Sequence, residues 1–372
     1  MTSSTSVAER GEFRDAIRAF LRAHSDEAVV RTMIEGPLQN NPAVWHRMAE
    51  EMELQGLNVP EDLGGSGLGA VEANVVLSEL GRALTPVPYL SSAVMATHML
   101  LALRASEEVD ELLGRLASGE LVMVAIHEPG IVAGDFNTLR AHARSREDAF
   151  VVSVPSTLVI EAHVAGMFLV PAWDGDEISL FVVDASDPQI RVESLEVLDA
   201  SRRVSRVTLE GAAAKRIGQP GRGWTALQQA LIPTVAGLSA EQVGVARKAL
   251  EIAVEYSRVR EQFGRKIGSF QAIKQKCADL MLMVEASEAM SLGAAAAIDS
   301  GSSDAAALSF MALAHCSDTA VYTATEAIEV LGGVGFTWEH SIHFYFKRAM
   351  ASSAILGTPM ACRERGIREL GR

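Results

Sequence analysis

The spacing of apolar residues changes twice along this chain, and each change marks a switch between helices and strands. Over residues 12–118, apolar side chains recur every three or four positions, which predicts amphipathic helices. Over residues 120–213, the pattern becomes short runs rich in Val, Ile and Phe with turn clusters between them, which predicts strands. Helical spacing returns after the glycine-rich segment at residues 218–223. The chain therefore reads as helical, then β, then helical.

This order predicts an α+β fold with three domains. We expect an N-terminal α-helical domain at residues 1–119, a middle antiparallel β domain at 120–217 and a C-terminal four-helix bundle at 218–372. The expected strands are residues 121–126, 149–154, 167–170, 178–183 and 204–209. The expected bundle helices are residues 224–260, 270–300, 305–331 and 339–356.

Composition narrows the classes of partner. A formal charge of −14 argues against nucleic acid, because phosphate backbones are recognised by basic surfaces. Three scattered cysteines lack metal-ligand spacing and indicate a reducing compartment. No signal-peptide pattern or uncharged apolar run of about 20 residues is evident, so a cytoplasmic protein with no membrane or metal partner is expected.

The first candidate site is a glycine turn between two predicted helices. Arg260 is followed by Phe263 and Gly264, and Gln271 opens the next helix. A guanidinium can hold a diphosphate with two hydrogen bonds while an aromatic ring supplies an apolar wall. Alternatively, Arg260 pairs with a surface carboxylate and Phe263 packs in the core.

The second candidate site follows the third helix of the predicted bundle. Glu329 precedes Gly332, Gly333 and Gly335, and glycines permit positive φ and close approach of backbone N–H groups to a phosphate. Alternatively, these glycines only cap a helix before the chain reverses.

The two turns, the loop at residues 59–65 and the α-β-α order together resemble the acyl-CoA dehydrogenase family. The resemblance implies a tetramer in which both turns contact the ADP half of an FAD held by a neighbouring subunit. Residues matching the family at these positions are Arg260, Phe263, Gln271, Gly332 and Gly333. Glu329 departs from the usual Gln, and a carboxylate is an unfavourable neighbour for a diphosphate.

The segments that would face the flavin ring resemble the family less. Glu128 and Pro129 match its Thr-Glu-Pro segment, but His127 replaces the Thr. His127 is read either as a donor to a flavin oxygen or as a loop histidine with partners in the chain. The second flavin strand, usually a Trp-Ile-Thr run, is not recognisable at residues 154–164.

The catalytic base is missing from both places where the family carries it. Leu356 stands at the first place and Thr234 at the second, and neither can accept a proton from a substrate. Glu241, about two helical turns after Thr234, is read either as a relocated base or, in preference, as a carboxylate with a structural contact. No catalytic residue is therefore assigned.

The resemblance implies an FAD-dependent oxidoreductase of lipid metabolism that dehydrogenates an acyl-CoA and passes electrons to an acceptor. Residues that serve a neighbour's FAD are kept, while those for the chain's own flavin and base are eroded. This favours a subunit whose homologous partner supplies the base, as in heteromeric acyl-CoA dehydrogenases of bacterial sterol breakdown. The alternatives are a self-sufficient homotetramer with a relocated base and a non-catalytic scaffold.

Overall fold

The computed structural model describes residues 6–36, 41–104, 106–128, 131–146 and 149–370. Within these ranges, contacts divide the chain into two compact units. Unit 1 contains residues 33–73 and 86–234, and unit 2 contains residues up to 32, 74–85 and 235 onward. Three helices have residues in both units: α2 (Glu27–Glu35), α4 (Ala70–Ala83) and α7 (Gly223–Val259).

Unit 1 contains the helices α3 (Pro42–Met52), α5 (Thr97–Leu101) and α6 (Glu107–Ala117), and a π-helical segment, Tyr89–Ala96. Asn41 and Ser106 cap α3 and α6 by accepting hydrogen bonds from backbone N–H groups three residues later. Every residue of the π-helical segment is buried, so this apolar stretch forms part of the core of unit 1.

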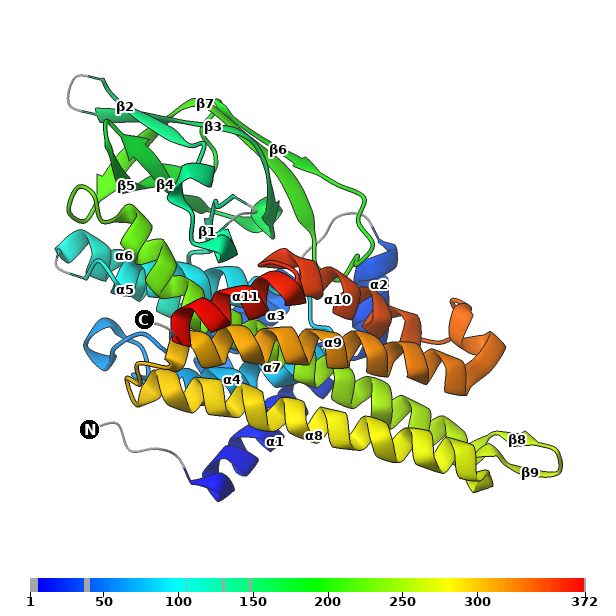
Figure 1. Ribbon diagram of the computed structural model, residues 1–372. Coiled ribbons are helices and arrows are strands. Elements are labelled where there is room, and N and C mark those ends of the chain that lie inside the picture. The colour runs from blue at the N-terminus through cyan, green and yellow to red at the C-terminus, as the bar shows by residue number, and fades with distance from the viewer. Residues whose placement is uncertain (1–5, 37–40, 105, 129–130, 147–148, 371–372) are drawn as a thin grey trace. The chain divides into compact units, whose positions relative to one another are not determined.

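The β part of unit 1 is a seven-stranded sheet whose pairing closes on itself (Figure 1). The strand order is β1-β4-β2-β3-β7-β5, and β5 also pairs with β4, so the central strands form a ring without free edges. Most pairs are antiparallel, whereas β4 runs parallel to β1 and β2. The strands are β1 (Met123–Ala125), β2 (His142–Arg146), β3 (Ala149–Ile160), β4 (Met167–Asp174), β5 (Glu177–Asp184), β6 (Ile190–Ser194) and β7 (Val204–Ile217).

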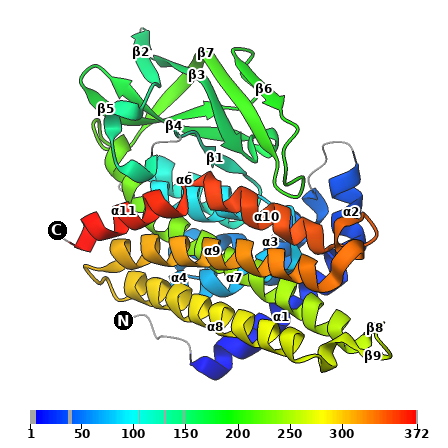
Figure 2. The same ribbon diagram turned by 45° about the vertical axis from the view of Figure 1, so that its right-hand side comes forward.

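Unit 2 is built around α9 (Ala305–Leu331), which packs against α8 (Gln271–Asp299), α10 (Ile342–Ile355) and α11 (Pro359–Leu370) (Figure 2). The long part of α7 and the N-terminal helix α1 (Val7–His24) complete it. The predicted bounds of α7, α8 and α9 agree with the structure to within one residue. The last predicted helix, α10, begins at Ile342, three residues after the predicted start at 339. α11 is an additional helix that the sequence pattern did not indicate.

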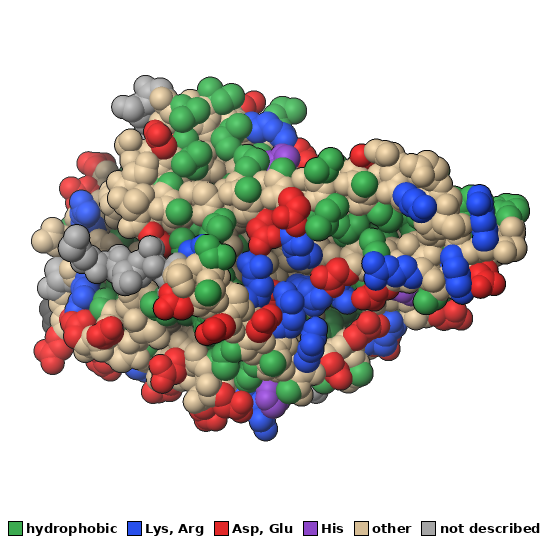
Figure 3. All heavy atoms as spheres, turned by 90° about the horizontal axis from the view of Figure 1, so that it is seen from below, with side chains coloured by type: hydrophobic (Ala, Val, Ile, Leu, Met, Phe, Trp, Pro, Cys, Tyr) green, Lys and Arg blue, Asp and Glu red, His purple; other side chains and the backbone are tan. Residues whose placement is uncertain are grey.

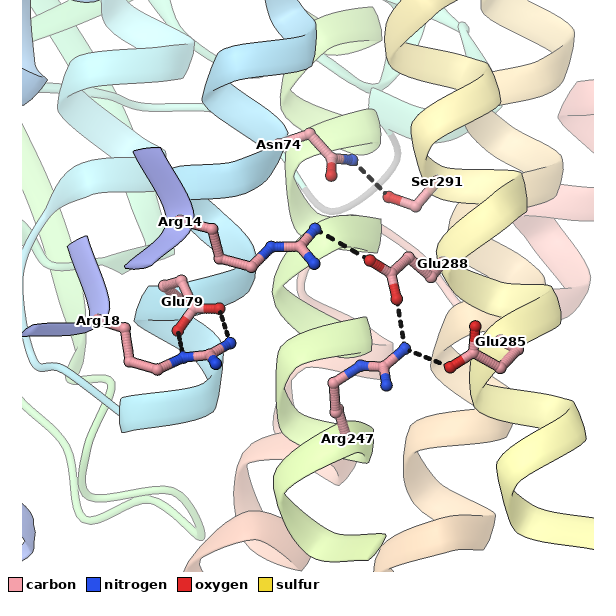
Figure 4. A network of polar contacts seen from close by, with 8 residues as sticks. All are labelled: Arg14, Arg18, Asn74, Glu79, Arg247, Glu285, Glu288 and Ser291. Atoms are coloured by element: carbon pink, nitrogen blue, oxygen red, sulfur yellow. Dashed lines mark hydrogen bonds and ion pairs between the residues drawn. The ribbon is translucent and has the colours of Figure 1, made fainter. Parts of the chain in front are cut away.

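Among the described residues, α8 is the one helix whose length and composition would allow it to cross a membrane. Its side chains are nevertheless tied into unit 2. Glu285 and Glu288 both form ion pairs with Arg247 of α7, and Glu288 also pairs with Arg14 of α1 at 2.9 Å (Figure 4). Figure 3 shows Lys and Arg side chains gathered in the middle of one face beside Asp and Glu side chains. α8 is thus held by polar contacts as a helix of the bundle.

The three cysteines are free, and two are fully enclosed. Burial raises the pKa of Cys316 to about 12 and that of Cys362 to about 11. Both thiols therefore remain protonated at neutral pH and act as small apolar side chains, as the sequence predicts.

Candidate functional site

Arg260 lies at the end of α7, where a two-stranded hairpin joins this helix to α8. The hairpin pairs β8 (Glu261–Gln262) with β9 (Arg265–Lys266), and the N–H of Ile267 donates to the carbonyl oxygen of Arg260 at 2.9 Å. Arg260 is exposed, and within the described parts of the chain its guanidinium has no carboxylate partner. The alternative in which Arg260 belongs to a surface ion pair therefore has no support in this geometry.

Phe263 occupies a strained position at the tip of this hairpin. Its φ is +54° and that of Gly264 is +76°, as a two-residue turn between strands requires. A bulky aromatic residue seldom adopts positive φ, and Phe263 is 91% exposed, so no core packing offsets the strain. Strain of this kind, together with an exposed ring, is typical of a residue that contacts something outside its own chain.

The second glycine turn begins where α9 ends. Gly332 has φ +66° and closes the helix, and the chain continues as a short 3-10 helix, Gly332–Phe336. A Cβ added to Gly332 or Gly333 would meet no atom within 4 Å among the described residues. A Cβ on Gly335 would lie 3.0 Å from the carbonyl oxygen of Ile328. Packing within the chain thus explains the glycine at 335, whereas the open face at 333 is free to receive a ligand.

Both turns lie at the same end of unit 2. α8 and α9 run antiparallel, so the start of α8, with Gln271 exposed at its first position, lies beside the end of α9. An ion pair confirms this proximity: Nζ of Lys276 on α8 lies 2.9 Å from Oε2 of Glu329 on α9. Gln271, Glu329, Gly332 and Gly333 thus lie at one end of unit 2, and the hairpin that carries Arg260 and Phe263 leads into α8 there. We call this region the nucleotide corner, after the ligand that the sequence resemblance implies for it.

A cavity of about 320 Å³ adjoins the nucleotide corner. Its lining is mostly apolar, and comes from the end of α9, the 3-10 helix and the start of α10: Thr325, Ile328, Glu329, Gly335, Phe336, Trp338, His343, Phe346 and Lys347. Burial, with Lys347 and Arg31 nearby, lowers the pKa of His343 to about 4, so its imidazole is neutral at pH 7. The aromatic side chains Phe336 and Trp338 in this lining are 77% and 57% exposed, so an apolar ligand could pack against them.

In unit 1, the segment after β1 carries His127 and Glu128. Burial lowers the pKa of His127, which keeps the imidazole neutral, and its Nδ1 lies 3.3 Å from the carbonyl oxygen of Glu128. The Glu128 carboxylate is buried and accepts hydrogen bonds from Arg140 at 2.9 Å and Thr157 at 3.5 Å. Glu128 thus ties this loop to β3. Pro129 lies outside the described residues.

The end of β3 forms the first part of residues 154–164, where the sequence shows no recognisable second flavin strand. β3 continues to Ile160 as one long strand, so the sequence pattern, which ended it at 154, made it too short. Its last three residues are Leu158, Val159 and Ile160, and Leu158 is 53% exposed. Leu158 therefore presents an apolar side chain on the outer face of this strand end, while the hydroxyl of Thr157, one residue earlier, donates to Glu128.

Neither expected base position holds an ionisable group. Leu356 is buried at the end of α10, and the hydroxyl of Thr234 donates to the carbonyl oxygen of Ala230 at 2.6 Å within α7. Within the described ranges, no group of three or more His, Cys, Asp or Glu side chains could hold a metal ion.

Glu241 forms a buried ion pair in unit 2. Its Oε1 lies 3.4 Å from a guanidinium nitrogen of Arg348 and 3.3 Å from the hydroxyl of Ser352, and Glu241 and Arg348 are both 3% exposed. To act as a base, this carboxylate would have to give up Arg348 in a region closed to solvent. The geometry favours the structural interpretation of Glu241.

Two ion pairs that involve candidate residues could not be found from the sequence. Lys276 and Glu329 are 53 residues apart, and Glu241 and Arg348 are 107 residues apart. In both cases the only sequence signal was a charged residue on a predicted helix, which many surface positions share.

Comparison with known proteins identifies the family of this chain. The acyl-CoA dehydrogenase N-terminal domain model matches residues 8–120, and the C-terminal domain model matches residues 221–369. The chain is 31% identical to acyl-CoA dehydrogenase IpdE2 of Mycolicibacterium smegmatis, over 94% of this chain and 95% of that protein.

Two solved structures extend the similarity. The ChsE4-ChsE5 complex from Mycobacterium tuberculosis has a TM-score of 0.88 and 26% identity, covering 100% of this chain and 99% of the other. A variant of the Tcur3481-Tcur3483 steroid ACAD has a TM-score of 0.85 and 26% identity, covering 98% of each chain. With helical N- and C-terminal parts around a β part, this chain belongs to the acyl-CoA dehydrogenase family of oxidoreductases.

Proposed function

We propose that this chain is one subunit of a two-chain, FAD-dependent acyl-CoA dehydrogenase, and that a homologous partner supplies the catalytic base. The observation that carries the proposal is the missing carboxylate. Leu356 and Thr234 stand at the two base positions, and Glu241 is held by Arg348 in the interior of unit 2. A family fold without a base needs one from elsewhere.

The chemistry divides between the two chains. Dehydrogenation removes a proton from the α-carbon of the thioester and a hydride from the β-carbon, and FAD, when bound, accepts the hydride. This chain's part is to bind and orient: the Arg260 guanidinium can clamp a diphosphate, and Phe263 can cover an aromatic ring. The backbone at Gly332 and Gly333 is open to close approach by a phosphate, because a Cβ added at either position would meet no atom within 4 Å among the described residues.

The relatives support a paired assembly. The two structures at 26% identity carry names that pair two proteins, and one is called a steroid ACAD. We infer a hetero-tetramer with a homologous subunit, in the cytoplasm, acting on an acyl-CoA with a steroid-sized group. An electron-transfer protein would reoxidise the flavin.

The chain purified alone should contain little flavin and show no acyl-CoA dehydrogenation. Co-expression with a family member that carries the base Glu should give a yellow complex that reduces an artificial electron acceptor when given an acyl-CoA. The lone chain has the nucleotide corner but lacks the partner's pocket for the flavin ring, so it should hold FAD only weakly. Visible absorbance, native mass and turnover measure the difference.

The matched control is the partner with its base Glu changed to Gln, which should still form the yellow complex but lose turnover. A lone chain that retains stoichiometric flavin and oxidises acyl-CoA would contradict the two-chain proposal and support a self-sufficient enzyme. A chain that never acquires flavin with any family member would support a scaffold.

Changing Arg260 to Ala should weaken FAD retention in the complex by about 1–3 kcal/mol, the usual cost of losing a charged hydrogen-bonding partner. The thermal stability of the chain should change little, because the Arg260 side chain is exposed and makes no ion pair within the described residues. Equilibrium dialysis of FAD and a thermal melt measure the two quantities.

A pair of glycine variants provides the control for this site. Gly333→Ala should lower FAD retention without lowering the melting temperature, because its Cβ would project into open space. Gly335→Ala should lower the melting temperature, because its Cβ would press on the Ile328 carbonyl oxygen. Unchanged flavin content in both Arg260→Ala and Gly333→Ala would remove the nucleotide corner from the proposal.

A further inference from the structure

Lys276, on the second turn of α8, contacts two carboxylates at the end of α9. It forms ion pairs with Glu326 and, at 2.9 Å, with Glu329. The Glu326 side chain is only 13% exposed, whereas that of Glu329 is 58% exposed and lines the cavity beside the glycine turn. Hydrogen bonds to Glu326 and then to Glu329 raise the pKa of Lys276, so the ammonium is charged throughout the neutral range.

This arrangement bears on the one position where the nucleotide corner departs from its family. A carboxylate at 329 repels a diphosphate, and the repulsion is largest where the low-dielectric protein surface replaces water. Glu329 comes three residues before Gly332, so its charge lies within a helical turn of the open glycine face. Without a counter-charge, the Glu329 carboxylate would repel a diphosphate that approaches the Gly332–Gly333 turn.

Lys276 supplies that counter-charge from the adjacent helix. The ammonium draws the Glu329 carboxylate toward α8, and its remaining partner, Glu326, is too enclosed to contact a ligand directly. A second ammonium, on Lys347, lines the same cavity as Glu329 and lies 4.6 Å from the centre of the Trp338 ring. Glu329 thus pairs with one ammonium, on Lys276, and shares its cavity with a second, on Lys347.

We propose that Lys276 is a positioning residue for the nucleotide, which neutralises Glu329 and holds its carboxylate away from the Gly332–Gly333 turn so that a diphosphate can approach. The inference rests on the proposed function, since it takes FAD as the ligand of the nucleotide corner. According to this proposal, FAD can bind beside Glu329 only when Lys276 neutralises the carboxylate. The effect of Lys276 on FAD binding therefore depends on which residue occupies position 329.

The test is a double-substitution cycle in the assembled complex with FAD as the probe. Lys276→Met should weaken FAD binding about five- to tenfold at low ionic strength, the size expected for one uncompensated charge near a phosphate. Added salt should shrink the defect, because exposed charges are screened. Glu329→Gln alone should bind FAD at least as tightly as the parent complex, because it removes the carboxylate that Lys276 neutralises.

Lys276→Met should also lower the melting temperature, because Glu326 loses its lysine. In the double variant Lys276→Met/Glu329→Gln, FAD affinity should return to that of the parent complex, whereas the melting temperature should stay below that of the parent. This split separates positioning from a structural role, which would lower both quantities together in either background. Lys276→Arg should keep FAD affinity, since a guanidinium also pairs with carboxylates. Lys248→Met, which removes a half-buried lysine 3.8 Å from Glu251 on α7, is the matched control and should leave FAD affinity unchanged.

An FAD defect of Lys276→Met that is equally large with Glu or Gln at position 329 would overturn the inference. A loss of FAD affinity that parallels the loss of melting temperature in every variant would also overturn the inference. If Arg260→Ala leaves FAD binding intact, the proposed function fails instead. A loss with Arg260→Ala and none with Lys276→Met would leave the nucleotide corner standing and reject only the role of Lys276.

Discussion

Replacing Arg348 with methionine is expected to lower the free energy of unfolding by about 3–5 kcal/mol, one of the two largest effects predicted for this chain. The substitution keeps much of the side-chain volume but removes the cation that lies 3.4 Å from the Glu241 carboxylate. Both side chains are almost completely buried, so water cannot replace the lost partner. Urea denaturation of the chain, followed by circular dichroism, measures the change.

The control is the double variant Arg348→Met/Glu241→Met. Replacing both members of a buried pair with apolar side chains of similar size is often neutral, because their desolvation cost disappears with their attraction. We therefore expect the double variant to recover most of the stability lost in the single variant. The cycle also addresses catalysis: if Glu241 were a relocated base, Glu241→Met would abolish turnover of the assembled enzyme even where stability is restored. Unimpaired turnover would confine Glu241 to its structural role.

Long elements with clear periodicity could be predicted from the sequence. The ends of α7 and α8 lie within one residue of prediction, because the glycine and phenylalanine positions that separate them also break helical spacing. Shorter elements with charged residues could not. β2 (His142–Arg146) and α11 (Pro359–Leu370) contain several arginines and few buried apolar residues. They therefore lack the apolar periodicity on which such predictions depend.

The candidate site shows the same limit. Residues on each glycine turn could be proposed from local spacing, because φ requirements and helix ends act over a few positions. The counter-charge for Glu329 could not, since Lys276 meets it only after α8 and α9 pack antiparallel. The two boundaries between the three expected domains stay a prediction, because contacts divide the structure into two units, each made of segments that alternate along the sequence.

Replacing Gly244 with alanine should destabilise unit 2 by about 3 kcal/mol, the upper part of the usual range for overpacking. A Cβ at this position would lie 1.9 Å from the carbonyl oxygen of Ser78 on α4, and 2.8 Å from the backbone nitrogen of Arg82. These are backbone atoms, so no rotamer change relieves the clash and α4 must move away from α7. A thermal melt should show a loss of at least about 6 °C.

Gly293→Ala is the matched control on a neighbouring helix. Its Cβ would meet no atom within 4 Å among the described residues, so the change should raise stability by up to about 1 kcal/mol through better helix propensity. Equal effects of the two substitutions would show that α4 and α7 are not in close contact. The same contact also positions Glu241, because a Cβ on Gly81 would lie 2.2 Å from the Glu241 carbonyl oxygen. Gly244→Ala should therefore also weaken the ion pair with Arg348, and its loss of stability should be less than additive with that of Arg348→Met.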